Sequence, residues 1–151
     1  MLPEQKIDGQ ILVPREGFCY ELGELKLYLI PLTHEGAQYE NCIHFGVRLE
    51  LDGKNILIPG DCRLCEEALA QEVSGQKIHL ALMNFPWLTL PQPRAFLLNK
   101  IQPQKALFYH LPFGEDDVNG FRPAAEKWLQ KLEDPRFGLL YQPLQRIEIE
   151  L

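Results

Sequence analysis

Three side chains that could bind a metal ion each stand just after a short apolar run of this sequence. They are His34, after residues 25–31, Asp61, after residues 54–59, and His110, after residues 105–109. Ligands in α/β proteins usually lie at the carboxyl ends of strands. Imidazole and carboxylate groups are ligands of catalytic zinc, which keeps one position for water and lowers the pKa of that water. The pattern therefore makes His34, Asp61 and His110 an incomplete candidate metal set, for zinc or for manganese or iron.

Asp61 belongs to the strongest local signal in the chain. Two apolar runs, residues 42–51 and 54–59, flank Asp52-Gly53. An Asp-Gly pair between two such runs predicts a β-hairpin. The second run ends in Gly60-Asp61, so the hairpin delivers an acidic side chain to a strand end.

The cysteines offer a second possible site. Cys62 and Cys65 form a Cys-x-x-Cys pair, and such pairs at the start of a helix can have a lowered pKa. No second pair accompanies them, which excludes a zinc ribbon. With no export signal in view, reduced thiols are favoured over disulfides, and buried, inert cysteines are favoured over redox or metal-binding ones.

Other polar and aromatic residues have ordinary structural interpretations. His44 and His79 fall inside predicted strands, and the acidic Asp116 and Asp117 are expected to be solvated loop charges. The aromatic segment at residues 85–88 is expected to line a pocket or an interface.

Short elements separated by twelve prolines and eleven glycines must position these groups. Periodicity predicts strands over residues 10–13, 18–22, 25–31, 42–51, 54–59, 77–83 and 105–109, with a weaker closing pair at 139–141 and 146–149. It predicts helices over 63–73, with Asp61 as its cap, over 93–100, and from Pro123 to about Leu132. Strands in series followed by strand–helix alternation predict an α/β (α+β) fold with a mixed sheet and helices on one face.

Composition limits the class of protein. The 151 residues fit one domain, residues 1–151, and 46% of them are hydrophobic. No apolar run approaches the roughly 20 residues that span a bilayer. The net charge is −6, without a basic stripe, which argues against a nucleic-acid partner. We expect a cytoplasmic protein with neither a membrane nor a nucleic acid as partner.

The stretch from about Gly23 to Phe113 resembles the C-terminal half of metallo-β-lactamase-fold hydrolases. In that family a histidine follows a strand, a hairpin leads to a strand that ends in Gly-Asp, and a later strand ends in a second histidine. His34, Gly60-Asp61 and His110 match those places. The resemblance implies half of an αββα sandwich, with Asp61 as a bridging metal ligand and each histidine serving a different metal.

The family's main ligand signature, His-x-His-x-Asp-His, is absent. The four histidines, at positions 34, 44, 79 and 110, are all ten or more residues apart, and only 33 residues precede the first. We therefore expect a degenerate, non-catalytic domain that acts in assembly or ligand binding, with no metal or only weakly bound metal. The alternative is a metal-dependent hydrolase of esters, amides or phosphoesters, active alone or with a partner that completes the site.

The predicted strands are apolar on both faces. Leu27 and Leu29 alternate with Tyr28 and Ile30, and Leu57 lies between two isoleucines. Strands of this kind need cover on both sides of the sheet. We expect a homodimer through the exposed sheet face, or a separate chain that supplies the missing half.

Overall fold

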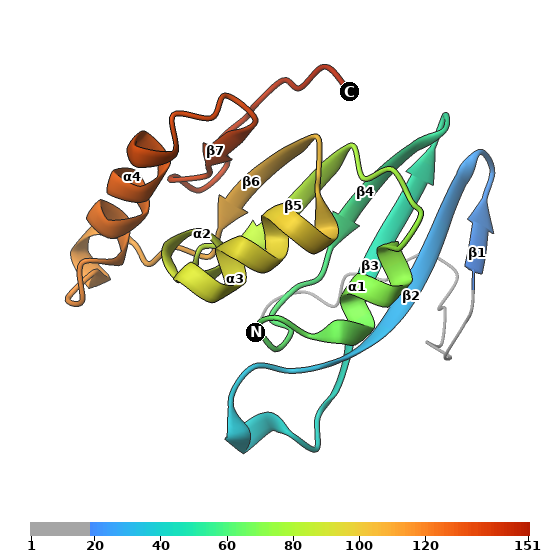
Figure 1. The fold of residues 1–151 in the computed structure, drawn as a ribbon, viewed down its shortest axis with the longest axis horizontal. Helices are drawn as coiled ribbons and strands as arrows, with labels where there is room; N and C mark the ends of the chain where they lie inside the picture. The colour runs from blue at the N-terminus through green and yellow to red at the C-terminus, as the bar shows by residue number, and fades with distance from the viewer. Residues whose placement is uncertain (1–18) are drawn as a thin grey trace, which may run out of the picture.

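The computed structural model describes residues 19–151, which form a seven-stranded mixed sheet in the order β1-β2-β3-β4-β5-β6-β7 (Figure 1). The strands are β1 (Cys19–Leu22), β2 (Leu25–Thr33), β3 (Ile43–Leu51), β4 (Lys54–Ile58), β5 (Leu80–Asn84), β6 (Lys105–Tyr109) and β7 (Phe137–Leu139). Neighbours from β1 to β4 are antiparallel, and those from β4 to β7 are parallel. The predicted mixed sheet is confirmed.

The hairpin between β3 and β4 forms as predicted. Leu51 pairs with Lys54, and the two turn residues, Asp52 and Gly53, have φ values of 49° and 70°. Two positive φ values in a row define the turn type that Asp-Gly favours. The prediction of two closing strands, at residues 139–141 and 146–149, was wrong in part. The first is β7, which begins two residues earlier at Phe137, and residues 146–149 form no strand. The predicted strand at 10–13 lies outside the described residues.

Four α-helices connect the parallel strands. They are α1 (Glu67–Val73), α2 (Pro86–Thr89), α3 (Pro91–Phe96) and α4 (Phe121–Leu132), with a π-helical turn η2 (Leu97–Ile101) after α3 and two 3-10 turns, η1 (Ala37–Tyr39) and η3 (Gly114–Asp116). The second and third helices were predicted nearly in place, whereas α2 was not predicted. None of the helices between residues 19 and 151 is long and apolar enough to span a membrane.

The first predicted helix begins four residues later than expected. Residue 66, and not Asp61, is the N-cap of α1, and its side chain makes no capping hydrogen bond. Instead, the Glu66 carboxylate accepts hydrogen bonds at 3.0 Å from the backbone N–H and the hydroxyl of Thr33. This contact between residues 33 positions apart holds the loop before α1 against the end of β2.

The helices pack on one face of the sheet, which we call the covered face. In Figure 1, α1 and α3 lie in front of the strands. Leu57, Ala81, Met83, Ala106 and Phe108 of the covered face are at most 1% exposed and form one core with helix residues. Burial therefore alternates along β4 and β6, where each buried residue stands between half-buried ones. The expected arrangement of helices on one face is confirmed.

Candidate functional site

Four strand ends meet at one edge of the sheet. β4, β5 and β6 are parallel neighbours, and β2 runs in the same direction as β4 because two antiparallel pairings separate them. Their carboxyl ends bring together His34, Asp61, Asn84 and His110, which we call the Asp61 site. The parallel arrangement is the reason that residues 76 positions apart in the sequence lie side by side.

Backbone hydrogen bonds fix His34 relative to Asp61. The N–H of Glu35 donates to the carbonyl of Asp61 at 2.8 Å, and the N–H of Arg63 donates to the carbonyl of Thr33 at 2.7 Å. His34 and Cys62 form an isolated antiparallel bridge between them. The loop after β4 is thereby joined to the end of β2 as a short continuation of the sheet.

Gly60 shapes the turn that presents Asp61. Its φ is 63°, and a Cβ at this position would lie 2.9 Å from Cε1 of His44. The ring of His44 is held there by a 2.9 Å hydrogen bond between Nε2 and the carbonyl oxygen of Pro59. A side chain at residue 60 would therefore be strained by its backbone conformation and would also collide with the His44 ring.

The Asp61 carboxylate is already engaged by the protein. Its Oδ1 accepts a hydrogen bond from the Asn84 side-chain amide and lies 3.1 Å from Nδ1 of His110. His110 has a positive φ of 66°, and Asn84 is only 8% exposed. The Asp61 side chain itself is 41% exposed, so one buried and one solvated partner converge on a single oxygen at the surface.

His34 makes local contacts. Its Nδ1 lies 2.7 Å from the carbonyl oxygen of Glu35, and its ring centroid is 4.6 Å from that of Tyr39 and 5.4 Å from that of His44. Hydrogen bonding to Glu35 leaves Nε2 as the ring nitrogen that can face a ligand.

A cavity of about 540 Å³ opens at this edge. Its lining residues are His34, Glu35, Tyr39, Asp61, Asn84, Phe85, Pro86 and His110. All three predicted site residues thus surround one cavity, with aromatic and proline side chains beside them. A concave pocket with an apolar wall and a few polar groups is typical of a small-molecule site.

Asn84 is a residue of the site that was not predicted from the sequence. It directly follows the apolar residues 80–83, so the rule that selected His34, Asp61 and His110 could have selected it too. Phe85 lines the cavity as expected of the aromatic segment, whereas Trp87 and Leu88 are fully buried in the core.

The side chains of the site, as placed, do not fit a metal centre. Between residues 19 and 151, no group of three or more His, Cys, Asp or Glu side chains is arranged to hold a metal ion. Oδ1 of Asp61 has two protein partners and Nδ1 of His34 is bonded locally. The role of the three residues as metal ligands stays a prediction.

The cysteine pair lies in the loop before α1 rather than at its start. Cys62 is 1% exposed, and burial, aided by the nearby carboxylates of Glu66 and Glu35, raises the pKa of its thiol to about 12. Burial also raises the pKa of the Cys65 thiol. Both shifts disfavour the reactive thiolate, and the expected burial is confirmed for Cys62.

The acidic loop has a structural role. The Asp117 carboxylate accepts hydrogen bonds from the backbone N–H groups of Phe121 at 2.7 Å and Arg122 at 2.8 Å. These donors belong to the first turn of α4, where N–H groups lack helical partners. Asp117 is therefore explained by the helix it stabilises, and Asp116 is exposed.

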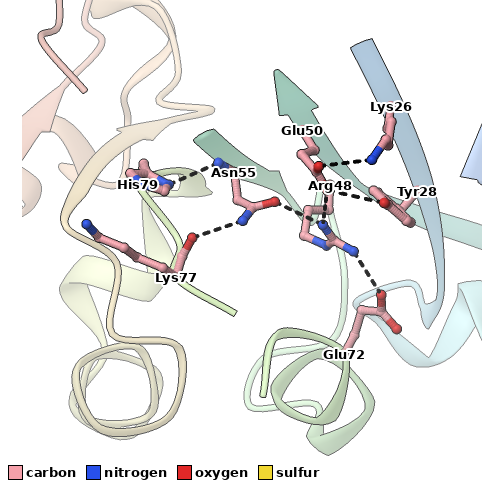
Figure 2. A network of polar contacts seen from close by, with 8 residues as sticks. All are labelled: Lys26, Tyr28, Arg48, Glu50, Asn55, Glu72, Lys77 and His79. Carbon is pink, nitrogen blue, oxygen red and sulfur yellow. Dashed lines mark hydrogen bonds and ion pairs between the residues drawn. The ribbon is translucent and has the colours of Figure 1, made fainter. Parts of the chain in front are cut away.

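His79 lies far from the Asp61 site, in a second polar cluster. The Arg48 network, drawn in Figure 2, consists of Lys26, Tyr28, Arg48, Glu50, Asn55, Glu72, Lys77 and His79. The His79 ring accepts a hydrogen bond at Nδ1 from the backbone N–H of Asn55, at 3.0 Å. This histidine is a structural residue, as predicted.

Comparison with known proteins shows similarity in structure and not in sequence. No protein-family model matches the chain, and no curated protein matches it. A proposed Zn-dependent hydrolase of the metallo-β-lactamase superfamily from Thermotoga maritima superposes with a TM-score of 0.59 at 12% identity, over 86% of this chain and 72% of that one. Igni18, a metallo hydrolase from Ignicoccus hospitalis, gives 0.59 at 16% identity, over 92% and 61%. The chain has the metallo-β-lactamase fold.

The fold is present in reduced size. CmlA, a diiron β-hydroxylase from Streptomyces venezuelae, superposes with a TM-score of 0.57 at 10% identity, and the match covers 83% of this chain but 32% of CmlA. Across the matched structures, the chain covers between 31% and 72% of the other protein. The expected half-sized form of the fold is confirmed. Because the matched proteins include hydrolases and a hydroxylase, the shared fold does not by itself assign a reaction.

Proposed function

We propose that this chain is a non-catalytic metallo-β-lactamase-like domain that acts in assembly or ligand binding. One observation carries the proposal, which is that Oδ1 of Asp61 is shared by Asn84 and His110 within the protein. Asp61 then serves as a hydrogen-bond acceptor that joins the ends of β4, β5 and β6. We expect any zinc, manganese or iron to bind weakly.

The surroundings of Asp61 support a structural role. The Asn84 amide is buried beside it, and a buried donor left without an acceptor costs about 1–3 kcal/mol. A metal ion at Oδ1 would compete with this hydrogen bond. The cavity with its wall of Tyr39, Phe85 and Pro86 remains available to an organic ligand without that conflict.

Metal content and hydrolysis test the proposal together. The purified full chain is analysed for zinc, manganese and iron, and assayed with p-nitrophenyl esters and phosphoesters in the presence of each metal. We expect substoichiometric metal and the same background rate in wild type and in Asp61→Asn. Stoichiometric metal that disappears in Asp61→Asn, together with loss of turnover, would overturn the proposal.

The alternative function is a metal-dependent hydrolase. It is favoured by the convergence of His34, Asp61 and His110 on one cavity and by the matched metallo hydrolases. It would act alone, or with a partner that completes the metal site. A cytoplasmic location fits either function, because all four cysteines are free thiols.

A further inference from the structure

We propose that a second copy of this chain docks on the sheet face opposite the helices. We call it the open face, and it is formed by the strand residues that alternate with those of the covered face. Its apolar members include Leu27, Leu29, Phe45, Val47, Leu49, Ile56, Ile58, Leu82, Leu107 and Tyr109, together with Leu80, which is buried at 8% exposure. The inference goes beyond the proposed function, since none of these residues lines the cavity at the Asp61 site.

Burial shows that this face lacks the cover that its composition demands. In β4 and β6 the covered-face residues Leu57, Ala106 and Phe108 are at most 1% exposed. Their neighbours on the open face, Ile56 and Leu107, are as apolar but only half-buried. The same strands thus bury one set of apolar side chains fully and the other set in part.

The edges of the open face are more exposed still. Ile43 is 86% exposed, Leu22 47% and Leu51 43%. Along the paired strands, the charged side chains of this face are Lys54 and Lys105, each near the amino end of its strand. The centre of the face carries no charge and therefore fits an uncharged, apolar partner surface.

The size of the face suits another sheet. From the lengths of the seven strands, with a spacing of about 4.8 Å between strands and a rise of about 3.3 Å per residue, it covers roughly 600 Å². This equals the largest apolar patch that a soluble monomer usually exposes, about 300–600 Å². It also reaches the lower end of stable interfaces, which bury about 600–1,000 Å² per partner.

The C-terminal segment covers this face at one side only, where Ile147 and Ile149 line a small cavity with Leu107, and Lys105 donates to the carbonyl of Glu150 at 2.7 Å. An extended segment as long as residues 1–18, which the structure does not describe, would occupy roughly 300 Å² of sheet, about half of the face. A second copy brings an equal and equally apolar face. Two such faces pack about 10 Å apart in an aligned sandwich, and a two-fold axis makes the contact self-complementary.

The two-fold axis would pass near β4, the central strand of the seven. Ile56 of β4 would then face the corresponding region of the partner. A glutamate at this position places two like charges in the desolvated centre of the interface, where they repel. In an isolated monomer the same side chain would remain half-exposed, so the fold tolerates it.

Sedimentation velocity of the full chain, from about 1 to about 100 µM, tests the proposal. We expect the molar mass of the sedimenting wild-type species to be about twice the 17.5 kDa of one chain. We expect Ile56→Glu to weaken dimerisation by at least about 100-fold while its circular dichroism stays native. Val118→Glu is the matched control, because it adds the same charge at an apolar residue that is 88% exposed and outside the sheet, and it should remain dimeric.

A well-folded wild-type monomer across the whole range would overturn the proposal. Open-ended aggregates in place of a dimer would also contradict a two-fold contact. If Ile56→Glu fails to fold, the wild-type dilution series and the milder Ile56→Thr, expected to dissociate at higher concentration than wild type, decide the question.

Discussion

Polar side chains gather at both ends of β4, and the two groups are held in different ways. At the amino end, Arg48 is 5% exposed, and its Nη1 donates to Oδ1 of Asn55 at 2.9 Å (Figure 2). At the carboxyl end, Asp61 is 41% exposed and lines a cavity. The centre of the Arg48 network, which is Arg48, Asn55 and His79, is at most 8% exposed, whereas the Asp61 site is open on one side.

The comparison separates residues that hold the fold from residues available to a ligand. The Asn55 side chain accepts from Arg48 and donates to the carbonyl of Lys77 at 3.2 Å. The backbone N–H of Asn55 donates to Nδ1 of His79, and the backbone carbonyl of Asn55 accepts from the N–H of His79. The Arg48 guanidinium also lies 3.7 Å from the centre of the Tyr28 ring. The buried centre of this network has no side open to a ligand, so we expect its loss to affect stability, and loss of the Asp61 site to affect binding.

The largest effect is expected from Arg48→Met. This change removes the donor to Asn55 and the contact with the Tyr28 ring while it keeps much of the side-chain volume, and it should lower the free energy of unfolding by about 3 kcal/mol. Urea denaturation measures it. Arg63→Met, at an exposed arginine in the loop near the Asp61 site, is the control and should cost below about 0.5 kcal/mol. Equal losses of unfolding free energy in the two variants would contradict the distinction between the Arg48 network and the Asp61 site.

Gly60→Ala should be the next largest, at about 2 kcal/mol. The left-handed backbone costs about 1–2 kcal/mol for a residue with a Cβ, and the contact with His44 adds to this. Gly53→Ala is a matched control, because its φ is 70° but a Cβ there meets nothing within 4 Å. A cost at Gly60 no greater than that at Gly53 would show that the His44 contact does not shape the turn.

A smaller, pH-dependent effect is expected from His79. Burial, followed by the nearby Lys54 and Lys77, lowers the pKa of its imidazole. The folded state therefore favours the neutral ring, whose Nδ1 accepts from Asn55, and this stabilisation is complete above the unfolded pKa of about 6.5. It declines as the pH falls below that value.

Urea unfolding at several pH values between about 5 and 8 measures this dependence. His79→Gln should reduce the fall in stability below pH ~6.5, and His34→Gln, in the open site, serves as the comparison. If His34→Gln reduced the fall as much as His79→Gln did, the assignment to the buried histidine would be wrong.

The smallest effect is expected from Asp61→Asn. An asparagine oxygen can still accept the hydrogen bond from Asn84, so stability should change by less than about 0.5 kcal/mol. Asp61→Ala removes that acceptor and should cost about 1 kcal/mol. Thermal and urea unfolding distinguish the two variants, and an equal, large loss in both would point to a role for the negative charge.

Much of the fold could be predicted because its signals are local. Alternating apolar residues and the Asp52-Gly53 turn defined β3 and β4 to within a residue at each end. The start of α1 could not be predicted, since it depends on Glu66 bonding to Thr33 in a distant strand. The short α2 was missed because Pro86 and Trp87 give little helical periodicity.

The site was predictable only in its location. Strand ends are visible in the sequence, and the three predicted residues do surround one cavity. The hydrogen bond between Asn84 and Asp61 depends on how β4 and β5 are placed side by side, which no local pattern encodes. The sequence therefore indicates where the site lies but not that Oδ1 of Asp61 accepts a hydrogen bond from Asn84.

Thermal unfolding with and without zinc most directly tests the claim that Asp61 is engaged by the protein and binds zinc only weakly. A site with a Kd of about 1 µM for zinc would stabilise the fold by about 2.7 kcal/mol at about 100 µM zinc, which raises the Tm of a chain of this length by roughly 5–11 °C. We predict no rise in wild type beyond that in Asp61→Asn. A rise of this size that is present in wild type and lost in Asp61→Asn would contradict the account.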